Sequence, residues 1–165
     1  AGQLTIKLGS FDLASMLREA ITDALPNLSA LGQKAKLEVG EDIEVVGDRR
    51  HLLVALAHLI DNATRYAPEN SDVRIAGEIV DGNVEITIAD QGVGVGDEHA
   101  EGIFDPFERG ELTGMASSPG AGLGLTYVRA VAVAHGGDAL YESIPGSGAK
   151  FTIRIPARTG TQADD

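Results

Sequence analysis

Residues 58–66 read His-Leu-Ile-Asp-Asn-Ala-Thr-Arg-Tyr and close a helix that the sequence predicts from the spacing of its apolar residues. Leucine, isoleucine and alanine recur at intervals of three and four residues, which gives the helix a single apolar stripe. Asp48 is the expected N-cap, and Pro68 ends the helix because the residue before a proline is driven out of helical backbone angles. Asn62 is therefore expected at the C-terminal end of a helix whose stripe faces a sheet.

The side chains around Asn62 suit a phosphate-bearing ligand. Its amide oxygen is a hard neutral ligand for Mg²⁺, an ion that keeps several waters and is shared with substrate phosphates. Arg65 and Tyr66 follow within one turn, so a cation and an aromatic ring can reach the same pocket. The alternative for these three residues alone is a capping asparagine followed by two side chains that extend along the surface.

A second motif, Asp90-Gln91-Gly92-Val93-Gly94, follows a predicted strand over about 83–90. A carboxylate just past a buried strand is placed to accept a hydrogen bond from an exocyclic amine such as that of adenine. Gly92 and Gly94 would let the backbone approach a flat base without a clash from Cβ. The alternative is an ordinary Asp-x-Gly turn.

Two further motifs follow in a glycine-rich region. Phe104-Asp105-Pro106-Phe107 is an apolar cluster in a predicted long loop, either a clasp for a lid or a simple docking point. Gly120-Ala121-Gly122-Leu123-Gly124-Leu125 opens a helix predicted to run to about 135, and free N–H groups at a helix start bind phosphate. The glycine spacing does not fit a Rossmann motif, and no Lys-Ser or Lys-Thr follows as in a Walker loop.

The remaining pattern predicts an α+β domain, a two-layer α/β sandwich with three helices on one face of a mixed, mainly antiparallel sheet. A first helix follows Asp12 as N-cap, and Pro26 and Asn27 lie near its end. Asp81-Gly82-Asn83 is a hairpin signal, and Gly136-Gly137 is expected to end the third helix. Strands are expected over about 1–9, 35–46 (one strand or a hairpin), 72–80, 83–90, 138–144 and 149–155.

Composition excludes several classes of protein. The chain has 165 residues, no cysteine and a formal net charge of −12, from 13 basic and 25 acidic side chains. One domain is expected over residues 1–156, with a disordered tail over 157–165. A nucleic-acid binder normally shows a basic face, and no such run is present. No signal peptide and no apolar run of roughly 20 residues, as a membrane span requires, is found.

The four motifs in this order resemble the catalytic, ATP-binding domain of bacterial sensor histidine kinases, within the GHKL (gyrase, Hsp90, histidine kinase, MutL) ATPase superfamily. The N box of that family resembles residues 58–66 and its G1 box resembles 90–94. Its F box resembles 104–107 and its G2 box resembles 120–125. The resemblance extends over nearly the whole chain and implies the Bergerat fold, with a long ATP lid over about 95–121.

The resemblance also implies a set of site residues, with ATP and Mg²⁺ bound and ADP formed. Asn62 would hold Mg²⁺, Arg65 would contact phosphate and Tyr66 would lie along the adenine. Asp90 would bind the adenine amine, and Arg109 in the lid would meet the γ-phosphate. The other residues assigned to the nucleotide pocket are Gly92, Gly94, Phe107, Gly120, Gly122, Leu123, Gly124, Leu125 and Thr152.

In such kinases the γ-phosphoryl group goes to a histidine on a separate dimerisation helix, and then to an aspartate of a response regulator. The implied partners are the dimerisation and histidine-phosphotransfer helices of the same parent protein and a receiver domain. No nucleic acid and no direct membrane contact are expected. The domain is expected in the cytoplasm, whether or not the parent is anchored to a membrane.

Two features depart from the family. His58 stands where many histidine kinases have Asn and where water-activating ATPases have Glu. A neutral histidine there could take a proton or orient a water, or it could simply form a polar wall of the pocket. No phosphoacceptor segment of the type His-Glu-x-x-Thr-Pro surrounds any of the four histidines. The chain alone is therefore expected to bind ATP without phosphorylating itself.

Two alternative functions use the same fold. A catalytically degenerate, ATP-binding interaction module is suggested by His58. A serine kinase of the anti-sigma-factor type would suit a free-standing domain, although such proteins resemble the ATPases in having Glu at the position of His58.

Overall fold

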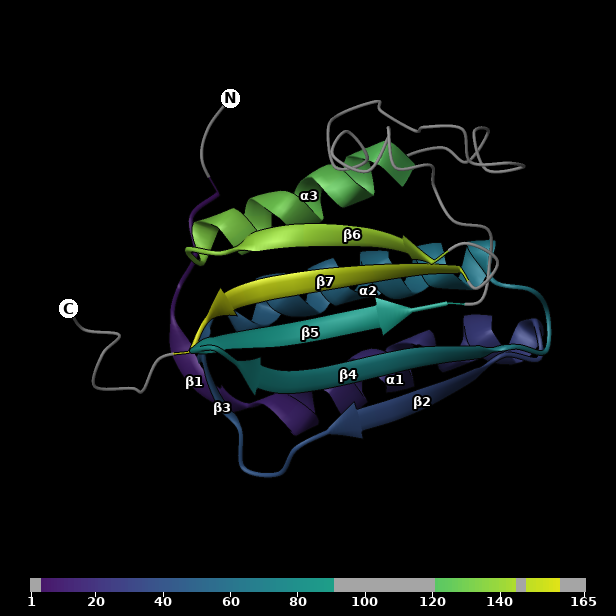
Figure 1. Cartoon of the computed structure of the whole chain (residues 1–165), viewed down its shortest axis with the longest axis horizontal. Helices are drawn as coiled ribbons and strands as arrows, with labels where there is room; N and C mark the ends of the chain where they lie inside the picture. The colour runs from purple at the N-terminus through teal and green to yellow at the C-terminus, as the bar shows by residue number, and fades with distance from the viewer. Residues whose placement is uncertain (1–3, 91–120, 145–147, 158–165) are drawn as a thin grey trace.

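A computed structural model describes residues 4–90, 121–144 and 148–157 of the chain (Figure 1). Within these elements the side chains of residues 121–124 and 143–144 are not described. The lid predicted over 95–121 lies almost wholly outside the described residues, and so does nearly all of the tail predicted over 157–165.

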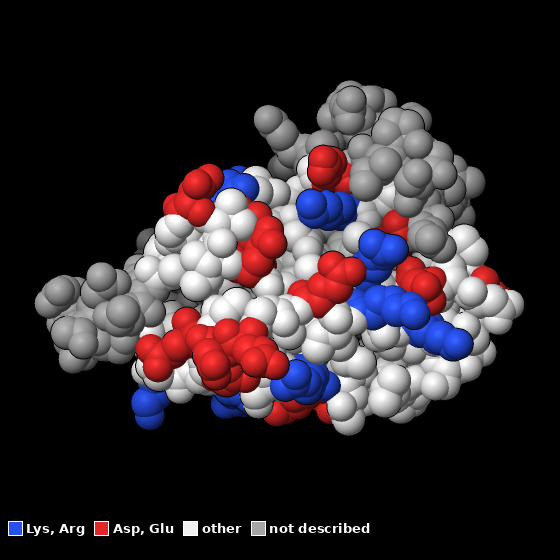
Figure 2. Space-filling view, turned by 60° about the horizontal axis from the view of Figure 1, so that its bottom comes forward, with Lys and Arg blue, Asp and Glu red and all other residues white. Residues whose placement is uncertain are grey.

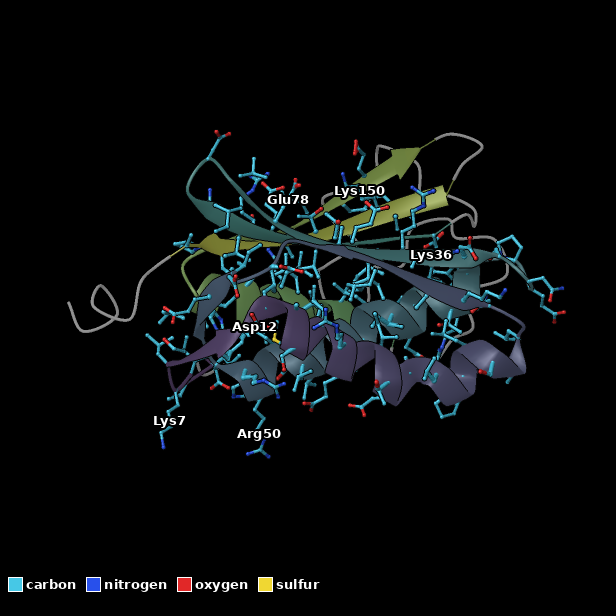
Figure 3. The ribbon with its side chains drawn as sticks, turned by 90° about the horizontal axis from the view of Figure 1, so that it is seen from below. Lys7, Asp12, Lys36, Arg50, Glu78 and Lys150 are labelled. Carbon is cyan, nitrogen blue, oxygen red and sulfur yellow. The ribbon has the colours of Figure 1, made fainter. Side chains whose placement is uncertain are left out.

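The described residues form two layers, a sheet on one side and helices on the other (Figure 3). The main sheet has five strands in the order β2-β4-β5-β7-β6. The pairing of β2 with β4 is parallel and the other three pairings are antiparallel. The strands are β2 (Lys34–Val39), β4 (Asp72–Val80), β5 (Asn83–Ala89), β6 (Asp138–Ile144) and β7 (Gly148–Pro156). This confirms the predicted α+β sandwich with a mixed, mainly antiparallel sheet.

The helices are α1 (Leu13–Ala30), α2 (Arg49–Tyr66) and α3 (Ala121–Ala134). Both predicted N-caps are confirmed. Asp12 Oδ2 accepts a hydrogen bond from the Ser15 N–H at 2.8 Å, and Asp48 Oδ1 accepts one from the His51 N–H at 3.1 Å. The apolar stripes of α1 and α2 and the inward side chains of β4, β5 and β7 form one buried core. None of the helices in the described residues is long and apolar enough to cross a membrane.

The turns follow the glycine signals. Asp81 and Gly82 have φ angles of 51° and 80°, as the tight hairpin between β4 and β5 requires. Gly136 has a φ of 85° and lies two residues after the last residue of α3, which confirms the predicted glycine stop. A Cβ on Gly137 would collide with the backbone carbonyl of Arg154, so only glycine lets α3 end this close to β7.

Helix α1 ends at Ala30, so Pro26 and Asn27 lie near its end as predicted, and Leu28 in its last turn is fully buried in the core. Two expectations were wrong in detail. The strand expected over 1–9 is instead β1 (Gly9–Asp12). The segment expected as one strand or a hairpin over 35–46 forms β2 and, after a turn, β3 (Glu44–Gly47), which joins a separate two-stranded sheet with β1. The two strands belong to different sheets because each pairs with a strand that is distant in the sequence. The local alternation of apolar and polar residues does not encode that pairing.

The start of α2 is tied to the end of α3 through His135. The Asp48 N–H donates to His135 Nε2 at 2.9 Å, and His135 Nδ1 donates to the Val131 carbonyl at 2.8 Å. Since a carbonyl only accepts and an N–H only donates, these bonds fix His135 as the neutral Nδ1–H tautomer. The Lys7 N–H also donates to Asp48 Oδ2 at 2.8 Å, so Asp48 joins three parts of the chain.

The carboxylate of Asp48 should make stability depend on pH. Burial raises the pKa of Asp48, but hydrogen bonds from the backbone N–H groups of Lys7 and His51 and the nearby imidazole of His51 outweigh burial, so the net pKa lies below the ordinary value of 3.8. Because the pKa of Asp48 is lower in the folded state than in the unfolded state, its ionised carboxylate stabilises the fold at pH values above 3.8. This stabilisation is lost as the pH falls from 3.8 through the pKa of the folded state.

We therefore expect Asp48→Asn, which keeps a capping oxygen but loses the charge, to lower the free energy of unfolding by about 1–2 kcal/mol at neutral pH. Urea unfolding of both proteins between pH 7 and pH 3 measures the difference. The difference should shrink once the pH falls below about 4, near the unfolded pKa of aspartate. A difference of constant size across this range would contradict the assignment.

Candidate functional site

Asn62 and Asp90 are two buried polar residues at one end of the molecule. Each is 4% exposed. Asn62 lies in the last turns of α2, and Asp90 directly follows β5. The C-terminal end of β5 and the end of α2 lie at the same end of the sheet (Figure 1), since Ala89 pairs with Arg74 near the start of β4, the strand that follows α2.

The backbone holds Asp90 firmly in place. Its N–H donates to the Ala149 carbonyl at 2.9 Å, which extends the ladder between β5 and β7 by one residue beyond the strand. The inward residues of β5 beside it are fully buried, so the carboxylate sits at the boundary of the apolar core. A carboxylate in such surroundings is costly unless it meets polar groups, which makes Asp90 a candidate for binding a ligand.

Asn62 has no such support from the protein. Among the residues that the structure describes, its side chain makes no hydrogen bond, although it is almost fully buried. Buried side-chain amides in folded proteins are normally hydrogen-bonded. A buried amide without a hydrogen bond to these residues, on the inner face of a helix, is suited to binding a ligand.

Gln33 holds the segment that carries Asn62. Its Nε2 donates to the carbonyls of Thr64, Ala67 and Pro68 at 3.1, 3.2 and 3.3 Å. These carbonyls belong to the end of α2 and the turn after it, where helix carbonyls lack partners in the helix itself. Sequence reasoning missed Gln33, because one polar residue after a helix carries no periodic or spacing signal.

Arg65 and Tyr66 are placed differently from each other. Tyr66 is partly buried and packs against the core. Arg65 Nε lies 3.1 Å from Asp61 Oδ2, and its side chain is 42% exposed. Arg65 is thus held along the surface of α2 by a neighbour one turn back, three residues after the buried Asn62.

His58 lies in the seam between α2 and α3. Its ring is in an edge-on contact with Tyr127, with ring centroids 5.6 Å apart. Tyr127 also shares a 2.6 Å hydrogen bond with His51 Nδ1. Burial raises the pKa of Tyr127, the Asp48 carboxylate raises it further and Arg50 opposes this, so the phenol stays protonated. This packing favours the polar-wall interpretation of His58. Tyr127 carried no recognisable signal in the sequence.

The structure does not bring Thr152 to this group. Phe151 and Ile153 of β7 are buried in the core, and successive side chains of a strand point to opposite faces. Thr152 therefore lies on the outer face, where it pairs with Thr87, and it is left out of the site. The inner position of β7 beside Asp90 belongs to Ala149, whose carbonyl receives the Asp90 N–H.

The glycine motif and the lid can be placed only in part. Leu125 is buried in the core within α3. Gly122, Leu123 and Gly124 belong to the first turns of the same helix. The other predicted site residues, which are Gly92, Gly94, Phe107, Arg109 and Gly120, lie outside the described residues.

A hollow of about 340 Å³ occurs elsewhere, and it is lined by Ser10, Phe11, Asp12, Asp42 and Glu44. It lies beside the small sheet of β1 and β3, at the opposite end of the molecule from Asp90 (Figure 1). Its three carboxylates make it unsuited to phosphate.

Comparison with known proteins agrees with this geometry. Residues 47–159 match the model of the family described as histidine kinase-, DNA gyrase B- and HSP90-like ATPase. The chain belongs to this family. Its relatives indicate that, within this family, the chain is an ATP-binding catalytic domain of the type found in sensor histidine kinases.

One relative is the sensor-like histidine kinase SenX3 of Mycobacterium tuberculosis, 35% identical over 149 residues. That match covers 88% of this chain and 36% of SenX3, so the chain spans about a third of that relative's length. The catalytic domain of histidine kinase ThkA has a TM-score of 0.81 at 26% identity and covers 92% of this chain and 97% of that one. Full-length ShkA in complex with AMPPNP has a TM-score of 0.84 at 26% identity, covering 97% of this chain and 33% of ShkA.

Replacing Gln33 should loosen the end of α2. In Gln33→Leu the three carbonyls lose their donor, and we expect the free energy of unfolding to fall by about 1–3 kcal/mol. Urea unfolding measures this loss. Asn83→Ala is the matched control, because the Asn83 amide makes a single long, exposed hydrogen bond of 3.5 Å in the hairpin. A loss in Gln33→Leu no larger than that of the control would show that Gln33 does not hold α2.

Proposed function

We propose that this domain binds Mg-ATP and donates the γ-phosphoryl group to a histidine on a separate dimerisation helix of the same parent protein. The observation that carries the proposal is Asn62, which is almost fully buried and makes no side-chain hydrogen bond to the described residues. The resemblance to the histidine kinases assigns Asn62 to the N box, and the buried Asp90 lies at the same end of the sheet. AMPPNP, found with the similar protein ShkA, is an analogue of ATP.

The residues fit a magnesium ion. No group of three histidine or acidic side chains gathers anywhere in the described part of the chain, so those residues form no all-protein metal cage. Mg²⁺ is usually bound by one or two protein oxygens together with waters and substrate phosphates, and the amide oxygen of Asn62 suits that role. When bound there, the ion would neutralise charge on the phosphates during transfer.

The remaining roles follow from position. Asp90 would accept a hydrogen bond from the adenine amine, because its carboxylate lies at the boundary of the core where a flat base can pack. Tyr66 would lie along the base, and Arg65 would leave Asp61 to meet a phosphate. A nitrogen of the acceptor histidine would attack the γ-phosphorus as the bond to the β-phosphate oxygen breaks, and ADP would leave. Such transfer requires chiefly positioning and charge stabilisation from the protein.

The acceptor histidine must come from outside the described residues. His51 shares a hydrogen bond with Tyr127, and His58 packs on the same ring. His135 uses both ring nitrogens to join α2 and α3. His99 lies outside the described residues. A helical segment of the parent protein is therefore the proposed acceptor, and a response regulator receiver domain is the proposed next partner.

The comparisons favour this function over the alternatives. The relative and the structures named above are all histidine kinases. Neither a serine kinase nor an interaction module without transfer activity gains support from a specific observation.

Nucleotide binding can be tested by thermal unfolding with ATP or ADP, each with and without Mg²⁺. Ligand at about 100 times its Kd should stabilise the fold by roughly 2.7 kcal/mol, a rise of about 5–11 °C in Tm for a domain of this size. Asp90→Asn should abolish the rise, because it replaces the charged acceptor for the adenine amine by a weaker amide oxygen and puts an NH2 donor in place of the second carboxylate oxygen. Asp81→Asn, in the exposed hairpin turn at the other end of β5, is the matched control and should keep it. No rise in the wild-type protein at millimolar nucleotide would overturn the proposal.

The role of Asn62 predicts a different result. In Asn62→Ala the nucleotide should still bind through Asp90, but the extra stabilisation that Mg²⁺ adds to ATP should be lost, a change of about tenfold or more in the Kd for ATP measured with Mg²⁺. Isothermal titration with and without the ion measures it. Asn27→Ala on the exposed side of α1 is the control. A Mg²⁺ effect that survives in Asn62→Ala would assign the ion to other groups.

A further inference from the structure

Polar side chains line the seam between α2 and α3. His51, His58 and Asn62 lie along one stripe of α2, because residues seven and four apart return to nearly the same side of a helix. Tyr127 of α3 contacts both histidines: its hydroxyl lies 2.6 Å from His51 Nδ1, and its ring centroid lies 5.6 Å from that of His58. The stripe that ends at Asn62 therefore faces α3.

The outer face of the sheet shows the more usual arrangement of polar groups. Lys34 lies opposite Asp72, and Lys150 lies opposite Glu142 on the neighbouring strand. Figure 2 shows acidic side chains next to basic ones in several places on the face that it presents. Opposite charges on neighbouring strands stabilise an exposed sheet by themselves, so they need no ligand. A seam between helices is normally filled with apolar side chains, so its polar rings require another explanation.

The two helices are antiparallel, and a hydrogen bond at one end fixes their register. The Asp48 N–H donates to His135 Nε2 at 2.9 Å, which places the start of α2 beside the end of α3. Asn62 lies fourteen residues after Asp48, and the start of α3 at Ala121 lies fourteen residues before His135. At about 1.5 Å per residue each distance is about 21 Å, so the first turn of α3 lies level with Asn62.

Tyr127 lies in the middle of this antiparallel pair. It is eight residues before His135, which is level with a point on α2 between His51 and His58. Its contacts with both histidines agree with this register. Beyond Tyr127 the pair of helices continues to Asn62 on one side and to the start of α3 on the other.

His51 fixes the orientation of the Tyr127 side chain. His51 Nε2 lies 3.8 Å from Asp48 Oδ2, so the carboxylate favours the proton on that nitrogen. His51 Nδ1 then accepts the hydrogen bond from the Tyr127 hydroxyl. Because the tyrosine is held at its hydroxyl, its ring keeps one orientation against His58.

His58 has polar atoms that the described part of the chain does not satisfy. Its side chain is partly buried, and among the described residues it makes the ring contact with Tyr127 but no hydrogen bond. Placing an N–H donor in a helix seam without a partner costs free energy, and an apolar side chain would fill the seam at less cost. An N–H donor one turn before Asn62, beside the first turns of α3, is suited to an anionic ligand such as phosphate.

We propose that Tyr127 is a positioning residue for the nucleotide site, which holds the His58 ring so that its N–H donates to a phosphate oxygen of the bound nucleotide. This inference rests on the function proposed above. It adds His58 as a phosphate contact and Tyr127, oriented by His51, as the support of that contact. As a hydrogen-bond donor His58 forms a polar wall of the pocket and takes no proton from the reaction.

Isothermal titration of Mg-ATP tests the inference. His58→Ala should raise the Kd about tenfold, since a hydrogen bond to a charged phosphate is lost. Tyr127→Leu should raise the Kd about three- to tenfold, because the freed His58 ring must be immobilised when the nucleotide binds. Tyr127→Phe keeps the ring contact and should stay within about twofold of the wild type.

A double variant separates positioning from a general loosening of α3. If Tyr127 acts through His58, then Tyr127→Leu should not change the Kd further in the His58→Ala background. The NMR signals of the His58 ring, identified by their absence in His58→Ala, give a second readout. They should shift on addition of Mg-ATP in the wild type and in Tyr127→Phe, and to a smaller extent in Tyr127→Leu. If Tyr127→Leu does not fold, judged by circular dichroism, then Tyr127→Met replaces it.

Phe11→Leu is the matched control. It also removes a partly buried aromatic ring, but from β1 at the opposite end of the molecule from Asp90 (Figure 1). It should lower the Tm, as the loss of any such ring does, without changing the Kd for Mg-ATP.

The outcomes distinguish this inference from the proposed function. No binding of Mg-ATP to the wild type would overturn both. An unchanged Kd in Tyr127→Leu, an equal loss in the His58→Ala background, or an equal loss in Phe11→Leu would overturn the role of Tyr127 and leave the ATP site in place.

Discussion

The position of α2 is the constraint on which the rest of the structure depends. This helix packs against α1, α3 and the inner face of the sheet, and each of its ends is tied by a buried polar residue. Asp48 caps the start and joins it to Lys7 and His135. Gln33 binds the carbonyls at the end. The helix is thereby fixed along its axis, so the buried amide of Asn62 keeps a constant position relative to the end of β5.

Much of this arrangement could be predicted from sequence, because the signals are local. Apolar spacing located the helices, and Asp12 and Asp48 each act within three residues of their own position. The turn at Asp81-Gly82 requires backbone angles that few residues adopt. Asn62 and Asp90 were found because motif order placed them, and the structure shows both to be buried at one end of the sheet.

What could not be predicted depends on contacts between distant segments. The separation of β2 and β3 into two sheets follows from their partners β4 and β1, which lie elsewhere in the chain. The face to which Thr152 points depends on the register of β7, and a shift of one residue reverses it. Gln33 and Tyr127 act through carbonyls and rings that only the fold brings near.

The place of β2 at one end of the sheet has a consequence for the behaviour of the protein at high concentration. In the described residues β2 pairs only with β4, so its other side presents backbone groups to which a strand of another copy could add. Lys34, Lys36 and Glu38 alternate along it and keep a charged side chain at every outward position. Edge strands that carry lysine resist such addition, because joining two copies would bring like charges together and strip water from them. The charges on β2 therefore help to keep the domain from polymerising through its open edge.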